Sequence, residues 1–317
     1  MLSDLGPVEV VTYRQREEGR PFLSDLLCEE SLPGGAGAAL WIVSWGFDVP
    51  WLLRQLKGRA CAYHAHSSGY GFSLPTGVPV LAVSRNTLGY WGDRAPRNPL
   101  WLVPNALSPD WLERGQRSGE GQRSIDVLVQ LRKNSAYVLK QLVPALQARG
   151  LRVQVQSGWV DDLVDLFNSA KVVLYDSADY WRGRGVTEGF GLPPLEALAC
   201  GCVVFSSLNH ALADTLDPGR MGHQLGSGTL AADLEAISAA VRDPAAWRPH
   251  QSDLRALLAS ASEAELLTRW RPAIDAINQH WDRIFAGEPA LKAPARWRLR
   301  LATKLRPIGS LAGRLKP

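Results

Sequence analysis

The chain has 317 residues with a formal net charge of +4, and 46% of the residues are hydrophobic. This length and composition are typical of a folded protein of two domains, and they exclude global disorder. The four cysteines form no CxxC pair, so the sequence predicts neither a disulfide framework nor a metal site. We expect a cytoplasmic protein, because no signal peptide and no apolar run long enough to span a membrane is visible.

In the first part of the chain, short apolar runs alternate with a helical pattern. Such uninterrupted apolar strands are typical of a parallel sheet that is covered on both faces. The polar, glycine-rich segment Ser108–Arg123 then predicts a linker. The elements predicted before it are a helix at Pro50–Leu56 and strands at Val8–Tyr13, Ala39–Ser44, Arg59–His64, Val78–Val83 and Leu100–Val103.

A second alternation of strands and helices follows the linker, and its βαβαβ order predicts a doubly wound sheet. The predicted strands are Ser124–Leu131, Leu151–Gln156, Val172–Tyr175 and Cys202–Ser206. The predicted helices are Ser135–Arg149, Trp159–Ala170, Leu195–Ala199, Ala231–Val241 and Ser252–Ile284, the last with a break near Pro272. The fold class is therefore α/β with two Rossmann-like domains.

The stretch TEGFGLPPLEALACGCVVFSS at 187–207 carries two carboxylates, Glu188 and Glu196. Its glycines allow a sharp turn and a close approach of the backbone to a ligand, and its two prolines suit the first turn of a helix. A loop of this kind presents free N–H groups to phosphate or to sugar hydroxyls. Glu196, on the helix, can accept hydrogen bonds from vicinal ribose hydroxyls. If the two glutamates stood as an isolated pair, ordinary solvated surface positions would be the favoured interpretation.

This stretch resembles the E-x7-E signature of glycosyltransferases with the GT-B architecture, in the family called glycosyl transferases group 1. The family pattern E-G-F-G-[LN]-x-x-x-E-A-[ML]-A-x-G-x-P-V reads EGFGLPPLEALACGCVVF here. The resemblance implies two Rossmann-like domains facing each other across a cleft, with a last helical segment around Trp270–Ile284 that crosses back onto the first domain. It implies that Glu188 and the loop residues Gly189, Phe190, Gly191 and Leu192 hold the donor sugar, and that Glu196 holds the ribose.

The resemblance also suggests roles for two cations and two histidines. Arg132 and Lys133 follow the first strand of the second alternation, where the family holds the donor diphosphate, although the family separates these two residues. His64 or His66 would face the donor sugar across the cleft. The alternatives are solvated charges at a helix start for the cations, and ordinary loop or core positions for the histidines.

Four further segments have candidate roles. Ser84–Asn86 and Pro104–Asn105 resemble two family stretches, of which the first ends a strand that faces the cleft and the second enters the linker between the domains. The polar insertion Asp176–Arg184 is typical either of a mobile loop over the donor or of a solvent loop. The segment Trp45–Asp48 could contact the acceptor or belong to the core.

By this resemblance the protein is expected to be an enzyme, a retaining, hexosyltransferase-like glycosyltransferase. It would move a sugar from a nucleotide-diphosphate sugar to a hydroxyl acceptor, which could be a glycan, a glycolipid or a small molecule, without a metal or other cofactor. The alternative is a non-catalytic GT-B relic that binds a nucleotide sugar as a partner or regulatory subunit, since the first domain is short. A dinucleotide-dependent enzyme has no support, because no GxGxxG follows a strand.

The expected domains are 1–115 on the acceptor side, 116–286 on the nucleotide-sugar side, and a basic amphipathic tail at 287–317. The tail has eight basic residues and no acidic one after Glu288, whereas the preceding body has 27 basic and 31 acidic residues. Such a tail is typical of an anchor on the inner membrane face, where a lipid-linked acceptor could lie, of a disordered extension, or of a helix that packs on the protein itself. Nucleic acid is not an expected partner, because the body is acidic.

Overall fold

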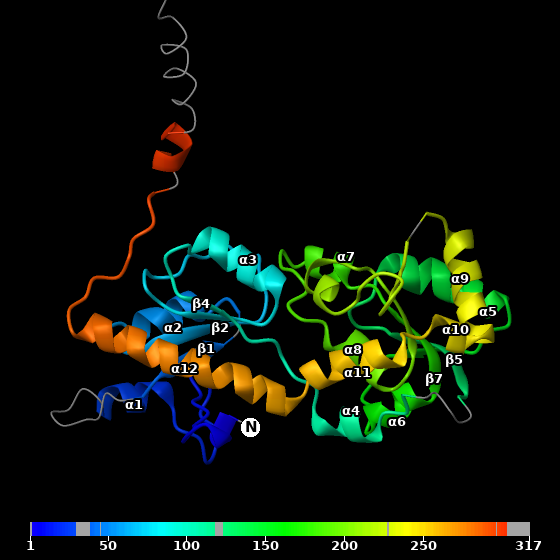
Figure 1. The fold of residues 1–317 in the computed structure, drawn as a ribbon, viewed down its shortest axis with the longest axis horizontal. Coiled ribbons are helices and arrows are strands. Elements are labelled where there is room, and N and C mark those ends of the chain that lie inside the picture. The colour runs from blue at the N-terminus through cyan, green and yellow to red at the C-terminus, as the bar shows by residue number, and fades with distance from the viewer. Residues whose placement is uncertain are drawn as a thin grey trace, which may run out of the picture.

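The structure is a computed structural model that describes residues 2–29, 39–44, 46–117, 123–226, 228–295 and 297–302. It has two lobes side by side, each built around its own sheet (Figure 1). The first sheet has the order β1-β2-β3-β4, and every neighbouring pair is parallel. Its strands are β1 (Trp41–Ser44), β2 (Cys61–Ala65), β3 (Val80–Ala82) and β4 (Leu100–Leu102).

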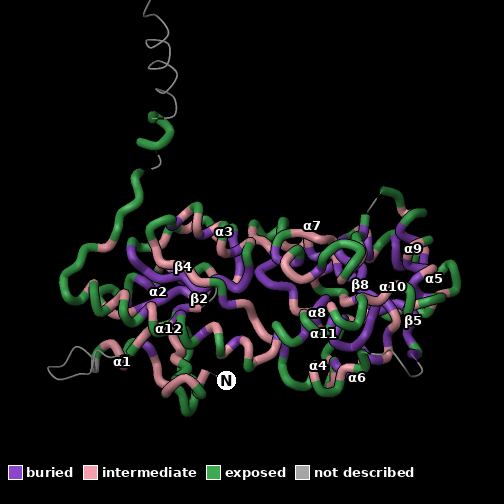
Figure 2. Tube along the Cα trace, viewed as in Figure 1, coloured by how far each residue is buried: buried purple, intermediate pink, exposed green. Residues whose placement is uncertain are grey.

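The second sheet has the order β6-β5-β7-β8-β9 and is also parallel throughout. Its strands are β5 (Ile125–Gln130), β6 (Val153–Gln156), β7 (Ala170–Tyr175), β8 (Val203–Ser206) and β9 (His223–Gln224). The central strands are buried along their length (Figure 2), which explains why they are continuous apolar runs in the sequence. The prediction of an α/β fold with two parallel sheets is therefore confirmed.

The helices cover both sheets. Those of the first lobe are η1 (Leu2–Asp4), α1 (Leu23–Glu29), α2 (Val49–Gln55) and α3 (Arg85–Arg94). The helices between the lobes and in the second lobe are α4 (Pro109–Arg114), η2 (Val138–Leu142, a π-helix), α5 (Val143–Ala148), α6 (Leu163–Asn168), α7 (Ala178–Arg182), α8 (Leu192–Ala199), η3 (His210–Asp214), α9 (Leu230–Arg242), α10 (Pro244–Trp247) and α11 (Gln251–Ser260), and α12 (Glu263–Phe285) follows them in the chain. The segment predicted as linker thus contains a helix, α4.

The last helix, α12, returns to the first lobe and packs along it (Figure 1). It buries Leu266, Trp270 and Ile277 against the first sheet. At its far end the Trp281 indole donates a hydrogen bond of 2.9 Å to the carbonyl of Cys61 in β2. The chain therefore crosses between the lobes twice, once before the second sheet and once after it.

Two of the predicted elements are wrong. Residues 8–13 form no strand, only an isolated bridge between Thr12 and Phe22, and Val8 and Val10 are exposed. Val11 and Tyr13 pack against the core of the first lobe, but no strand pairs with the run along its length. The helical break falls at Ala261 and not near Pro272, because the Ser262 side chain accepts a hydrogen bond from the backbone of Glu265 and starts α12 there.

Candidate functional site

The loop that carries Glu188 ends at Gly191, the N-cap of α8. Gly191 has a φ of 87°, and a Cβ there would lie 2.2 Å from Cδ2 of Leu212. Both its backbone conformation and its neighbour therefore require glycine. Gly189 has another reason to be glycine, because a Cβ would lie 1.5 Å from the carbonyl oxygen of His66 in the other lobe. The loop thus fits closely against the end of β2.

Two donors hold the Glu188 carboxylate. The side chain is only 4% exposed, and its Oε2 accepts hydrogen bonds from the Tyr175 hydroxyl at 2.6 Å and from the Trp181 indole at 2.7 Å. Burial, followed by the charge of Glu188, raises the pKa of Tyr175 well above its ordinary value, so the phenol stays protonated and donates. Glu188 is consequently fixed in one orientation between the end of β7 and helix α7.

Glu196 lies on α8, eight residues after Glu188. Burial raises the pKa of its carboxyl to about 7, and the nearby charge of Lys133 opposes this shift. Glu196 also raises the pKa of Tyr175, which places both carboxylates near the same phenol. Among the described residues, none donates a hydrogen bond to Glu196, so its carboxylate can accept hydrogen bonds from a ligand.

The cations Arg132 and Lys133 form the turn after β5 and are directed toward α7. Lys133 has a φ of 65°, and its Nζ lies 5.1 Å from the centre of the Trp181 ring. A hydrogen bond with Arg132 is the main reason why the pKa of Tyr180 is lowered. The adjacent Asn134 accepts a hydrogen bond of 2.8 Å from the backbone of Asp176, which connects this turn to the end of β7. Glu188 and the two cations therefore contact one helix, α7, whereas Glu196 lies close to Tyr175 and Lys133.

The two histidines of the first lobe contact each other, with 3.1 Å between Nδ1 of His64 and Nε2 of His66. Burial lowers the pKa of His64 to about 3 and that of His66 to about 4, so both are neutral at physiological pH. The His64 ring packs against Trp270 of α12, and its Nε2 is buried without a hydrogen-bond partner among the described residues. Because the His66 carbonyl contacts Gly189, His66 is the histidine that borders the loop.

Hydrogen bonds join the two lobes beside this loop. Ser67 donates to the carbonyl of Thr187 at 2.6 Å, and the hydroxyls of Ser68 and Thr187 are also 2.6 Å apart. The Asn86 amide donates to the Thr187 hydroxyl at 3.1 Å. Nearby, the backbone N–H of Arg85 donates to the Asp214 carboxylate at 2.7 Å. The structure is therefore closed at the carboxyl edges of the two sheets.

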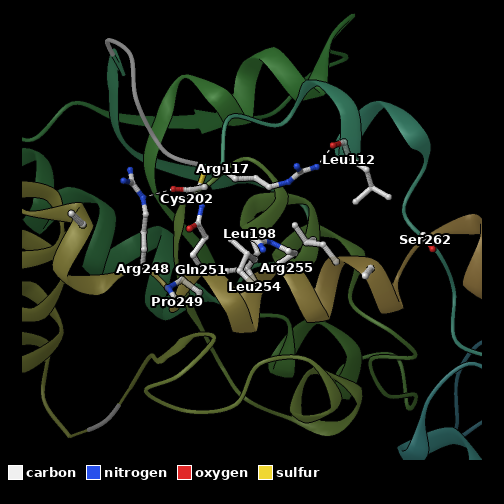
Figure 3. A pocket seen from close by; sticks show the side chains of 14 residues that line it. Leu112, Arg117, Leu198, Cys202, Arg248, Pro249, Gln251, Leu254, Arg255 and Ser262 are labelled. Atoms are coloured by element: carbon white, nitrogen blue, oxygen red, sulfur yellow. Dashed lines mark hydrogen bonds between the residues drawn. The ribbon is translucent and has the colours of Figure 1, made fainter.

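A cavity of about 690 Å³ lies elsewhere, between α4, the end of α8, and α11 (Figure 3). It is lined by Arg117, Arg248 and Arg255 together with leucines. Arg248 donates to the carbonyl of Gly201 at 2.7 Å, and Arg117 donates to the carbonyl of Leu112. At least two of these arginines therefore satisfy backbone carbonyls, and the cavity shares no residue with the site around α7.

The structure places the predicted site residues around α7 and the loop, and it adds three aromatic residues that the sequence reasoning missed. Tyr175, Tyr180 and Trp181 all contact the predicted carboxylates or cations. Tyr180 and Trp181 could have been noticed in the sequence as an aromatic pair within an otherwise polar insertion. The insertion itself contains a helix, α7. The predicted contact of Trp45 with the acceptor involves a residue outside the described part of the chain.

The described residues contain neither a metal-binding cluster nor a membrane-spanning helix. No cluster of three or more His, Cys, Asp or Glu residues in this part of the chain could hold a metal ion. No helix in it has the length and apolar character needed to cross a membrane. In the tail, Trp297, Leu299 and Leu301 are exposed, whereas Leu305 and Ile308 of the predicted amphipathic pattern lie outside the described residues.

Comparison with known proteins gives a family match for one part of the chain and a fold for most of it. Residues 137–253 match the family described as Glycosyl transferases group 1. A sucrose-phosphate synthase from Thermosynechococcus elongatus is 18% identical with a TM-score of 0.54, over 78% of this chain and 74% of that one. A glycosyltransferase from Rickettsia africae ESF-5 is 11% identical with a TM-score of 0.54, over 84% of each chain.

A mutant of TarM from S. aureus is 11% identical with a TM-score of 0.57, and this chain covers 59% of its length. The match between the two proteins covers 82% of the present chain. No curated protein sequence matches. These similarities show the GT-B fold, with the family region in the second lobe.

Proposed function

We propose that the protein transfers a sugar from a nucleotide-diphosphate sugar to a hydroxyl acceptor, because the chain has a GT-B fold and its residues 137–253 match the glycosyl transferases group 1 family. The observation that carries the proposal is that Glu188, Arg132 and Lys133 contact α7, while Glu196 lies close to Lys133 and Tyr175. Carboxylates accept hydrogen bonds from sugar and ribose hydroxyls, and adjacent cations pair with a diphosphate. UDP is a suitable first nucleotide to test, because the TarM mutant was solved in complex with UDP.

In the proposed roles, Glu196 binds the ribose, and Glu188 with the backbone of Gly189–Gly191 binds the donor sugar. Arg132 and Lys133 neutralise the diphosphate as negative charge develops on it during departure. His66 lines the opposite wall as a neutral imidazole. The reaction proceeds with retention and without a metal, and the departing phosphate takes the proton of the acceptor hydroxyl. Association of the tail with a membrane stays a prediction.

The test is thermal unfolding of the full chain with UDP, GDP, ADP and dTDP, each at a large excess. A nucleotide at about 100 times its Kd stabilises the folded state by about 2.7 kcal/mol. We expect one nucleotide to raise the Tm of the wild type and of Glu113→Ala, a matched control at an exposed position on α4, but not of Glu196→Ala.

The second measurement is release of the nucleotide from the corresponding nucleotide sugar when acceptors are added. Turnover would eliminate the non-catalytic alternative. Nucleotide binding that depends on Glu196, without turnover on any acceptor, would favour that alternative. The absence of a Tm shift with all four nucleotides would refute the proposed donor site.

A further inference from the structure

Aromatic side chains gather where β1 and β2 end, on the first lobe. Phe47 follows β1 and meets the Tyr70 ring edge to face, with ring centres 5.0 Å apart. Tyr70 stacks on Phe72 at 5.9 Å, and Phe72 in turn contacts the core residue Trp91. These three rings, which we call the aromatic rim, thus extend outward from the core to Phe47, which is 70% exposed.

Polar groups lie next to the exposed end of the rim. Asp48 follows Phe47 directly, and its carboxylate accepts hydrogen bonds of 2.8 Å from the Tyr13 hydroxyl and from Nε of Arg14. The Tyr13 ring is 6.0 Å from that of Trp51, which is 42% exposed. Exposed rings and charged hydrogen-bonding groups therefore occupy the same surface.

The aromatic rim adjoins the loop that carries Glu188. Gly69, directly before Tyr70, approaches the second lobe so closely that a Cβ there would lie 2.5 Å from the carbonyl oxygen of Gly185. Ser67 hydrogen-bonds the carbonyl of Thr187, the residue before Glu188. The rim and the loop that carries Glu188 therefore lie on adjoining segments of the two lobes.

A single exposed aromatic side chain would need no explanation, but an apolar patch of contiguous rings bordered by polar groups marks an interaction surface. Sugar rings suit this surface, because they have an apolar C–H face that packs on an aromatic ring and hydroxyls that bond to groups such as Asp48 and Arg14. A small aromatic compound prefers an enclosed pocket that buries most of its surface, unlike a ring as exposed as Phe47. An anionic membrane attracts clusters of unpaired basic residues, whereas Arg14 is paired with Asp48.

We propose that the aromatic rim is an acceptor subsite for a saccharide chain, with Phe47 as the stacking platform for one of its sugar rings. The role of this saccharide as the acceptor rests on the proposed function. The binding of a saccharide at Phe47 does not depend on it. Phe47 is well suited to mutation, because its exposed side chain contributes little to the core.

The experiment measures the binding of the UDP-saturated full chain to a glycan microarray, and then titrates the best oligosaccharide by calorimetry. The variants are Phe47→Ala, Phe47→Trp, and Phe285→Ala as the matched control at a second exposed phenylalanine. We expect Phe47→Ala to raise the Kd about tenfold, Phe47→Trp to change it less than about twofold, and Phe285→Ala to leave it unchanged.

The inference is overturned if no glycan binds, or if Phe47→Ala binds as tightly as the wild type. It is also overturned if Phe47→Ala abolishes binding of 2-naphthol or of phosphatidylglycerol vesicles while glycan binding persists. Thermal unfolding with UDP separates the two proposals, because Phe47→Ala should keep the UDP-induced shift. Glycan binding at Phe47 in a protein that binds no nucleotide would contradict the proposed function and retain the saccharide subsite.

Discussion

At the scale of single residues, the ionisation of Glu196 should be visible in the stability of the whole protein. Its pKa is raised to about 7 from an ordinary value of 4.5, so the folded state holds a proton that the unfolded state has lost between these values. The contribution of Glu196 to stability is therefore present below about pH 4.5 and is lost as the pH rises to 7.

We expect Glu196→Gln, which cannot ionise, to be more stable than the wild type at pH 8 by about 1–3 kcal/mol. The gain should shrink substantially at pH 5, because there the wild-type folded state is protonated at little cost. Urea unfolding at the two pH values measures the difference, with Glu113→Gln as the control that should show none. An equal gain at both pH values would mean that Glu196 ionises normally in the folded protein.

Trp181 is expected to be a positioning residue for Glu188. In Trp181→Phe, the carboxylate loses one of its two donors while it remains buried, and a hydrogen bond to a charged group contributes about 1.5–3 kcal/mol. We expect a loss of stability of that size, measured by urea unfolding, together with a higher KM for the donor. If Trp181 only fills space, stability would fall without a change in KM.

The chain offers a matched control for this substitution. Trp159 also donates its indole N–H to a carboxylate, that of Asp161 at 3.0 Å, but its side chain is 91% exposed. Trp159→Phe should therefore change stability by less than about 0.5 kcal/mol and leave KM unchanged, since exposed hydrogen bonds exchange with water at little net cost.

At the scale of elements, the start of α8 depends on Gly191. Alanine there would adopt a left-handed backbone, which costs about 1 kcal/mol, and would also press on Leu212. Overpacking adds about 1–3 kcal/mol. The control is Gly150→Ala, where φ is 81° but no atom lies within 4 Å of the added Cβ. Thermal unfolding should show a larger loss for Gly191→Ala, and equal losses would exclude the contact with Leu212 as a cause.

The buried strands and the loop before α8 could be predicted because their signals are local. Apolar runs such as Val127–Val129 and Val172–Tyr175 must lie inside, and glycines and prolines at fixed positions start a helix. Val8–Tyr13 misled the prediction, because an apolar run becomes a strand only when a neighbouring strand accepts it. Pro272 misled it in another way, since the burial of Trp270 and Ala273 offsets a proline within α12.

At the scale of the whole molecule, the site is assembled from segments that lie far apart in the sequence. The contacts of Gly189 with His66 and of Thr187 with Ser68 join residues more than 110 positions apart, and no local pattern encodes them. The sequence could identify Glu188 and Glu196, but not the donors Tyr175 and Trp181, because their role depends on where α7 packs. Family resemblance supplied the two lobes, and only the structure shows how closely they meet.

The close contact between the two lobes leads to a prediction about domain closure. In Gly189→Ala the new Cβ would overlap the carbonyl of His66, which is backbone of the other lobe and cannot move aside alone. Each lobe can still fold, but the lobes should no longer close at the carboxyl edges of their sheets. We expect a larger radius of gyration by small-angle X-ray scattering, and a kcat lower by about a hundredfold, since a displacement of about 1 Å has effects of that size.

The control for closure is Gly158→Ala, whose added Cβ meets no atom within 4 Å and whose backbone is not left-handed. It should keep the radius of gyration and the kcat of the wild type. Nucleotide binding distinguishes a defect in closure from damage to the second lobe, because Glu196, Arg132 and Lys133 all belong to that lobe and should still bind UDP in Gly189→Ala. A variant that binds UDP and stays compact, yet loses activity, would show that Gly189 acts within the loop and not through the meeting of the two lobes.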